Sequence, residues 1–185
     1  MAGVLAQEGG EILGLQGRAE QEALALLEAH QASEEQIPPL LLRARLLQGL
    51  NRGEDALPLL EKGIERHPDD KRLRLAYARK LATTQRYSEA YELLEKALRL
   101  KPDDAAIIDS MGWLHYRTGK YPDALNLLRQ AYEAAPNAEI GAHLGEVLWV
   151  IGDKEEARRI WREAQQREPD SDTIRETLDR LKADL

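Results

Sequence analysis

The sequence contains no cysteine, so neither a disulfide framework nor a metal site with thiolate ligands can form within it. This absence is neutral between reducing and oxidising compartments. The chain also lacks any run near the eighteen or so apolar residues that a membrane-spanning helix needs. Its N-terminus lacks the basic and apolar pattern of a signal peptide. We therefore expect either a cytoplasmic protein or the mature part of a longer precursor.

Basic residues are in deficit. The 26 Lys and Arg residues are outnumbered by 33 Asp and Glu residues, which gives a formal net charge of −7. Affinity for nucleic acid depends on neutralising phosphates with Lys and Arg. The composition therefore predicts no nucleic-acid partner.

The motifs of common catalytic and cofactor sites are missing as well. There is no glycine-rich phosphate loop and no Gly-x-Ser-x-Gly turn. The acidic residues are numerous, but carboxylates on a charged helical surface are usually solvated. We interpret the chain as a non-enzyme without cofactor or metal, and an enzyme on a helical scaffold is the least favoured alternative. No two histidines have the short spacing of a metal site among His30, His67, His115 and His143.

What the sequence does contain is a repeat. Four prolines follow one another at spacings of 34, 34 and 33 residues, and small residues recur at fixed distances before each of them. Small residues in phase with a proline column predict pairs of amphipathic helices that approach closely. The columns are Pro68, Pro102, Pro136 and Pro169; Ala56, Ala90, Ala124 and Ala157; Gly63, Ala97, Ala131 and Ala164; and Ala44, Ala78, Gly112 and Gly145.

The period and pattern resemble the tetratricopeptide repeat family. The resemblance implies an all-α fold, a right-handed α-solenoid of antiparallel helix pairs, and a role as a scaffold for protein partners. The third repeat matches best, through Met111, Gly112, His115, Gly119, Ala124, Leu128, Ala131 and Pro136.

We divide the chain accordingly. Residues 1–36 are expected to hold an irregular segment and half a repeat, in which Ala23 and Leu27 take the places of Ala56 and Leu60, so the natural protein is expected to continue upstream. Residues 172–185 are expected to form a capping helix with one apolar stripe, Ile174, Leu178, Leu181 and Leu185. Residues 37–171 form four repeats, 37–70, 71–104, 105–137 and 138–171.

The small columns predict where the helices cross. Gly112 and Ala124 are expected to mark the crossing within the third repeat, and Trp161 to fill the core beside the equivalent crossing in the fourth. His115 falls in a column otherwise occupied by leucines, so core packing is its expected role.

Function is then expected on the concave groove lined by the first helix of each repeat. Residues one, four or five places after the small residue, or three places before it, point away from the second helix. This groove is predicted to be basic in its N-terminal half, and aromatic and partly acidic in its C-terminal half. The predicted protein-binding residues are Arg45, Arg72, Arg79, Asp109, Trp113, Tyr116, Arg117, Glu146 and Trp149.

A closer resemblance concerns residues 110–164. The pieces Ser-Met-Gly-Trp at 110–113 and Ala-His-Leu-Gly-Glu-Val-Leu-Trp at 142–149 resemble the C-terminal repeats of proteobacterial outer-membrane tetratricopeptide lipoproteins. That group implies an adaptor for a periplasmic carboxyl-terminal processing protease and its peptidoglycan hydrolase substrates. It also implies a place on the periplasmic side of the outer membrane, with an anchor outside this chain. The alternatives are a general peptide-binding module in pilus, secretion or chaperone assembly, and a cytoplasmic location.

Overall fold

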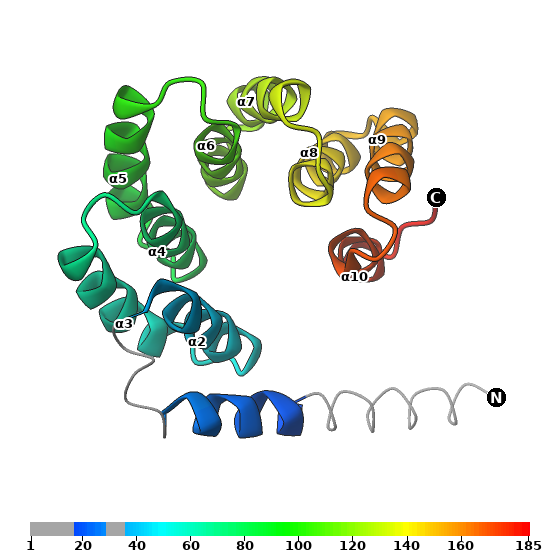
Figure 1. Cartoon of the computed structure of the whole chain (residues 1–185). Helices are drawn as coiled ribbons and strands as arrows, with labels where there is room; N and C mark the ends of the chain where they lie inside the picture. The colour runs from blue at the N-terminus through cyan, green and yellow to red at the C-terminus, as the bar shows by residue number, and fades with distance from the viewer. Residues whose placement is uncertain (1–16, 29–35) are drawn as a thin grey trace. The chain divides into compact units, whose positions relative to one another are not determined.

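The computed structural model describes residues 17–28 and 36–185, and every regular element within these ranges is an α-helix (Figure 1). The predicted all-α solenoid fold of helix pairs is confirmed. The irregular segment expected before residue 17 lies outside the described residues. One helix covers residues 17–28. The others are α2 (Ile37–Gly49), α3 (Gly53–Arg66), α4 (Lys71–Thr83), α5 (Tyr87–Leu100), α6 (Ala105–Arg117), α7 (Tyr121–Ala134), α8 (Ala138–Ile151), α9 (Lys154–Arg167) and α10 (Asp172–Leu181).

The chain divides into two compact modules, Met1–Gln85 and Arg86–Leu185, which we call the N-terminal and C-terminal modules. The division falls in the turn between α4 and α5, which is inside the second of the expected repeats. The C-terminal module therefore contains α5 to α10.

One residue in the turn between the two helices of each repeat has a left-handed backbone. The φ angles are 57° at Asn51, 63° at Gln85, 78° at Gly119 and 97° at Gly152. These four positions recur at the repeat period. Glycine adopts this conformation without the steric cost that other residues incur. The turn geometry is therefore the same in all four repeats, but only the third and fourth repeats have a glycine at this position.

Short polar side chains begin several first helices. Asp70 accepts hydrogen bonds from the backbone N–H groups of Arg72 and Leu73 at the start of α4. Asp104 and Asn137 do the same at the starts of α6 and α8. These side chains satisfy backbone donors that have no partner inside the helix, which explains why an acid or amide lies just before each of these helices.

The N-terminal module packs the helix at 17–28 together with α2, α3 and α4. Its buried residues include Leu24, Leu40, Leu60 and Leu73. With Ala23 and Leu27 in the places of Ala56 and Leu60, Leu24 takes the place of Leu57, and both of these leucines are buried. Ala23 and Leu27 themselves are partly buried.

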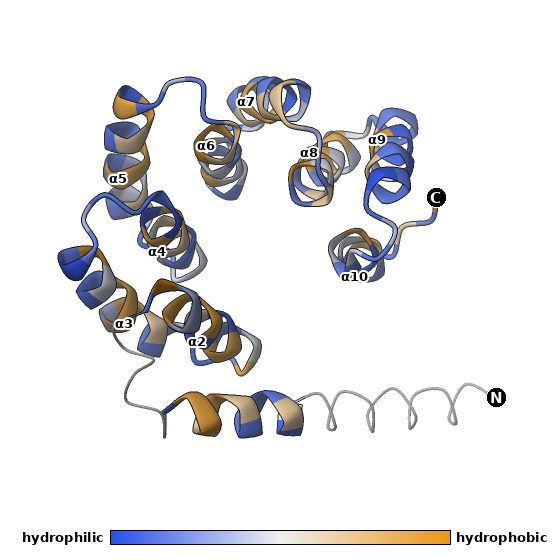
Figure 2. Cartoon of the chain, viewed as in Figure 1, coloured by the Kyte–Doolittle hydropathy of each residue, from blue (hydrophilic) through white to orange (hydrophobic). Residues whose placement is uncertain are grey.

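The core of the C-terminal module surrounds α8. Trp161, Leu128 and Leu144 are among its fully buried side chains, so the prediction for Trp161 is confirmed. Figure 2 shows α9 as a mostly hydrophilic helix, and Trp161 lies on its buried side. A Cβ added at Gly145 would lie 2.1 Å from Nε1 of Trp161, so the glycine makes the space that the indole fills.

The expected partner of Gly112 also needs correction. A Cβ at Gly112 would lie 2.8 Å from Cγ of Leu128 and 3.2 Å from Cβ of Leu127, so the close approach is one turn beyond Ala124. Ala124 is fully buried beside it. The small residue of the first helix therefore packs against the large residue of the second helix, which sequence columns alone do not distinguish.

The terminal helix α10 packs on α8 and α9. Ile174 is buried, Leu178 and Leu181 are partly buried against the core, and Thr177 is buried with them. Leu185, which we expected to extend the stripe, lies beyond the end of the helix and is 38% exposed.

The expected core role of His115 is only partly correct. Its side chain is 14% exposed, and it forms part of the wall of a cavity between α5 and α6. Leucine occupies the equivalent position in the other repeats, whereas His115 borders a cavity on one side.

Candidate functional site

The candidate site lies on the C-terminal module, where α8 contacts both α6 and α10 (Figure 1). α6 and α8 are the first helices of the third and fourth repeats, and α10 follows them as a first helix would. This is the face on which the sequence predicted an aromatic and acidic groove.

Trp113 is the central aromatic side chain of this face. Its ring stacks on that of His143, with centroids 4.2 Å apart and planes at 22°. It also contacts Tyr116, at a centroid distance of 4.9 Å. The indole is partly buried, so one side of it is fixed by neighbours and part of its surface is left for a partner.

His143 is held by a buried carboxylate. Its Nδ1 lies 2.7 Å from Oδ1 of Asp109, whose side chain is 1% exposed. This contact joins α6 to α8 and fixes the plane of the imidazole against Trp113. Sequence reasoning missed His143, although it lies 34 residues after Asp109, which is one repeat period.

Glu146 has two partners on two other helices. Arg180 on α10 donates to it from both terminal nitrogens, at 2.8 and 2.5 Å. The Tyr116 hydroxyl on α6 donates to Oε1 at 3.1 Å. Glu146 is 3% exposed, and the hydrogen bonds from Arg180 and Tyr116 compensate for the burial of its charge.

These contacts correct the predicted acidity of the groove. Asp109 and Glu146 lie on the expected helices, but both are buried and bonded within the protein. They position Trp113, His143 and Tyr116 rather than offer a negative surface. Helical phase gave their direction, but it could not show that side chains from the next helix cover them.

Trp149 belongs to a different contact. Its ring packs against Trp161 with centroids 5.6 Å apart, and Lys154 Nζ and Arg158 Cζ lie 4.7 and 5.2 Å from its centroid. All three neighbours are on α9, so the structure holds Trp149 by packing and cation–π contacts. Its place in the predicted groove therefore stays a prediction.

The predicted basic residues lie in various settings. Arg117 is exposed, one turn after Trp113 on α6. Arg45 is exposed and Arg79 is partly buried, and both belong to the N-terminal module. Arg72, in the same module, is paired with Asp70 at 2.7 Å at the start of its own helix.

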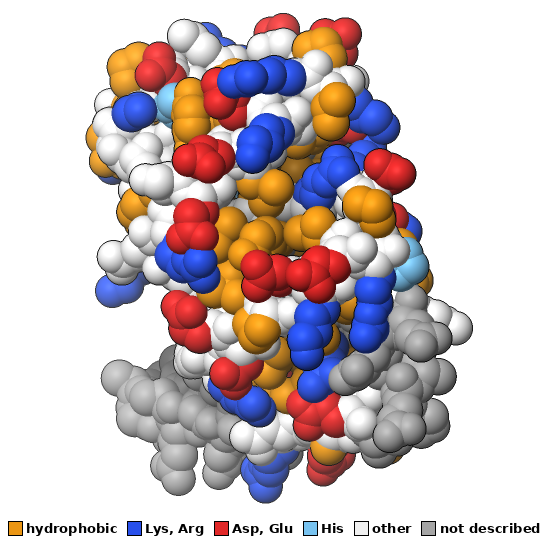
Figure 3. All heavy atoms as spheres, turned by 90° about the vertical axis from the view of Figure 1, so that its left-hand side faces the viewer, with side chains coloured by type: hydrophobic (Ala, Val, Ile, Leu, Met, Phe, Trp, Pro, Cys, Tyr) orange, Lys and Arg blue, Asp and Glu red, His pale blue; other side chains and the backbone are white. Residues whose placement is uncertain are grey.

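The face drawn in Figure 3 does not concentrate one sign of charge. Figure 3 shows acidic and basic side chains interspersed on one face, with hydrophobic side chains exposed between them. Within residues 17–28 and 36–185 there is no group of three His, Asp or Glu residues placed to hold a metal ion. None of the described helices combines the length and apolar character required to cross a bilayer.

Burial and the charge of Glu146 raise the pKa of Tyr116 from an ordinary 10.0 to about 12. Folding therefore favours the neutral phenol, and this contribution is complete below pH 10 and is lost as the pH rises through about 12. We expect the free energy of unfolding to fall less steeply between pH 10 and 12 in Tyr116→Phe than in the unmodified protein. Urea unfolding across this pH range measures both slopes, and equal slopes would contradict the assigned role of the Tyr116 hydroxyl.

Comparison with known proteins gives the family. Models of the tetratricopeptide repeat match residues 38–62, 51–114 and 110–172, which together span most of the chain. The chain is a tetratricopeptide repeat protein. Proteins with these repeats serve as scaffolds for interactions with other proteins, and the repeat is itself a non-catalytic unit.

Three similar proteins illustrate the range of the family. The TPR repeat-containing protein PA4667 of Pseudomonas aeruginosa is 63% identical over 57 residues, which cover 31% of this chain and only 10% of that relative. The crystal structure of TTC0263, a thermophilic TPR protein of Thermus thermophilus, has a TM-score of 0.73 at 21% identity and covers 95% of this chain and 96% of its own. YrrB, described as a TPR protein with an unusual peptide-binding site, has a TM-score of 0.52 at 16% identity over 88% and 84% of the two chains. The two structures share the fold.

Proposed function

We propose that this tetratricopeptide repeat protein is a non-catalytic scaffold that binds a segment of a partner protein on the face formed by α6, α8 and α10. The observation that carries the proposal is the setting of Trp113, which is stacked on His143 and held beside Tyr116 but only partly buried. Tryptophan, tyrosine and arginine are the residues most enriched among binding hot spots.

The surrounding polar contacts support this role by making the face rigid. Asp109 fixes His143, and Glu146 fixes Tyr116, so both neighbours of Trp113 are already in place before a partner arrives. A side chain that loses little freedom on binding contributes more to affinity. Since both carboxylates are buried and hydrogen-bonded within the protein and Arg117 is exposed one turn away, the face suits an apolar anchor next to acidic residues. YrrB shows that a protein of this fold can bind a peptide.

The more specific proposal is an adaptor for a carboxyl-terminal processing protease and its peptidoglycan hydrolase substrates, on the periplasmic side of the outer membrane. Its support is the resemblance of residues 110–164 to the lipoproteins of that group. A general module in pilus, secretion or chaperone assembly is the alternative, and it uses the same face.

Substitution of Trp113 by alanine tests the shared part of both proposals. We expect the dissociation constant for a partner that binds this module to rise by roughly thirtyfold, corresponding to about 2 kcal/mol for a hot spot. Trp149→Ala is the matched control, because this second partly buried tryptophan packs on α9 and should lower the melting temperature while leaving affinity nearly unchanged. Unchanged affinity in well-folded Trp113→Ala would reject the site.

A reconstituted digestion separates the two proposals. Purified protease and hydrolase are incubated with the full chain, with Trp113→Ala, or alone. The adaptor proposal requires that the full chain accelerates cleavage and that the variant does so less. Binding of another protein through Trp113, without any acceleration, would retain the scaffold and reject the adaptor role.

A further inference from the structure

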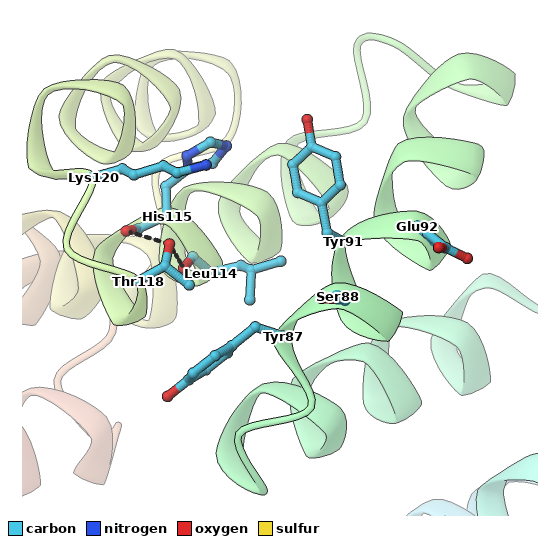
Figure 4. A pocket seen from close by; sticks show the side chains of 8 residues that line it. All are labelled: Tyr87, Ser88, Tyr91, Glu92, Leu114, His115, Thr118 and Lys120. Atoms are coloured by element: carbon cyan, nitrogen blue, oxygen red, sulfur yellow. Dashed lines mark hydrogen bonds between the residues drawn. The ribbon is translucent and has the colours of Figure 1, made fainter.

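A second site lies on the other side of α6. A cavity of about 380 Å³ opens between α5, the end of α6 and the turn into α7 (Figure 4). His115 follows Trp113 by two residues, a rotation of roughly 200° around the helix, so the cavity faces away from the Trp113 site. Its volume is within the range of roughly 300–1,000 Å³ of small-molecule sites. It is lined by Tyr87, Ser88, Tyr91, Glu92, Leu114, His115, Thr118 and Lys120.

One end of this cavity carries nitrogen atoms. Figure 4 shows the side chains of Lys120 and His115 next to each other, opposite Tyr91. His115 forms part of the wall beside the ammonium group of Lys120, whose N–H groups suit a ligand with hydrogen-bonding oxygens.

The rest of the cavity is apolar and aromatic. Leu114 is buried and contributes an apolar wall, and the rings of Tyr91 and His115 meet in a T-shaped arrangement at a centroid distance of 6.1 Å. Tyr91 is 42% exposed, so its ring is open to a ligand. Tyr87 lies on the same helix one turn earlier.

The positive charge of the cavity suits a ligand with a single negative charge. Burial and the nearby charge of Lys120 lower the pKa of His115, so its imidazole is neutral at neutral pH. Lys120 is then the one cation among the lining residues, and Glu92 points away from it in Figure 4. A phosphate dianion is usually met by several donors such as the Arg fork, which this cavity lacks.

We propose that this cavity binds a carboxylate with an apolar, preferably aromatic, body, and that Lys120 and His115 hold the carboxylate while Tyr91 and Leu114 contact the body. The ligand can be a free small acid or the C-terminal residue of a polypeptide, which share this chemistry. The site is independent of the proposed partner face around Trp113.

The test uses 3-phenylpropionate as the probe and its neutral amide as the matched control. In an NMR titration of the full chain, the acid should shift the imidazole signals of His115 and the amide should not. Lys120→Gln should weaken binding of the acid by about tenfold or more, the effect expected for loss of a charged hydrogen bond. Lys96→Gln, an exposed lysine of α5 outside the cavity, should have no effect.

A second variant, Tyr91→Ala, tests the aromatic wall of the cavity. It removes an exposed ring and should weaken both the binding of the acid and the shift of the His115 signals. An acetylated tripeptide ending in phenylalanine identifies the source of the ligand. Tighter binding of the peptide than of the free acid indicates a polypeptide end, and weaker binding indicates a small acid. The proposal is overturned if the acid leaves His115 unshifted, if the amide binds equally well, or if the two lysine variants behave alike.

Discussion

Arg180→Ala is expected to lower the free energy of unfolding of the C-terminal module by about 3 kcal/mol. Removing one partner of a buried ion pair typically costs about 3–5 kcal/mol, because the other charge stays buried without compensation. Here Glu146 is 3% exposed and would keep only the Tyr116 hydroxyl. The side chain of Arg180 is 55% exposed, so water can partly replace it, which places the effect at the lower end of the range.

The same helix provides a control for this substitution. Arg175 pairs with Asp172 at 2.6 Å, and their side chains are 67% and 62% exposed. Exposed pairs of this kind contribute about 0–1 kcal/mol. Urea midpoints of Arg175→Ala and Arg180→Ala should therefore differ clearly, and equal midpoints would show that Glu146 does not depend on Arg180. Glu146→Gln added to Arg180→Ala should recover part of the loss, because the buried charge is then gone.

Gly145→Ala is the second substitution with a large expected effect. The new methyl group would lie 2.1 Å from Nε1 of Trp161, which is fully buried and rigid. Overpacking costs typically about 1–3 kcal/mol, and we expect about 3 kcal/mol here because neither partner can move. This loss exceeds the gain of about 1 kcal/mol that alanine brings to a helix interior relative to glycine.

The repeats themselves suggest the control and the rescue. Gly112→Ala meets Cγ of Leu128 at 2.8 Å, a longer distance than the 2.1 Å at Gly145, so its net cost should be below that of Gly145→Ala. In the first two repeats alanine and leucine occupy the same two positions, as Ala44 with Leu60 and Ala78 with Leu94. Trp161→Leu should therefore offset part of the damage of Gly145→Ala. Melting temperatures of the two single variants and of the double variant test this coupling. If the change in the double variant equals the sum of the changes in the two single variants, the coupling is contradicted.

The fold was accessible from the sequence because its signals are periodic. The proline and small-residue columns locate every helix pair, and Trp161 could be assigned to the core because it replaces leucine in a column. Periodicity identifies positions and does not identify contacts between helices. That is why Gly112 was paired with Ala124 instead of Leu128.

The site was predicted less completely, for a similar reason. Helical phase placed Trp113 and Tyr116 on one side of α6, which faces α8 in the structure, but it treated Asp109 and Glu146 as exposed. Whether a carboxylate is exposed depends on the next helix, which supplies His143 to one and Arg180 to the other. The sequence did contain a usable signal. Asp109 and His143 are 34 residues apart, and so are Glu146 and Arg180, which is one repeat period. Opposite charges or hydrogen-bonding groups at that spacing predict contacts between successive first helices.

The bonds of Glu146 and Asp109 also have a mechanical consequence. They join α6 to α8 and α8 to α10, and none of them joins the two helices of one repeat. An array of repeats bends and stretches mainly by sliding each repeat over its neighbour, since each contacts only the next. Polar bonds between neighbours oppose that sliding more than apolar contacts do, because they hold only over a narrow range of distance and angle. The last three first-helix positions therefore act as a stiff segment of the fold.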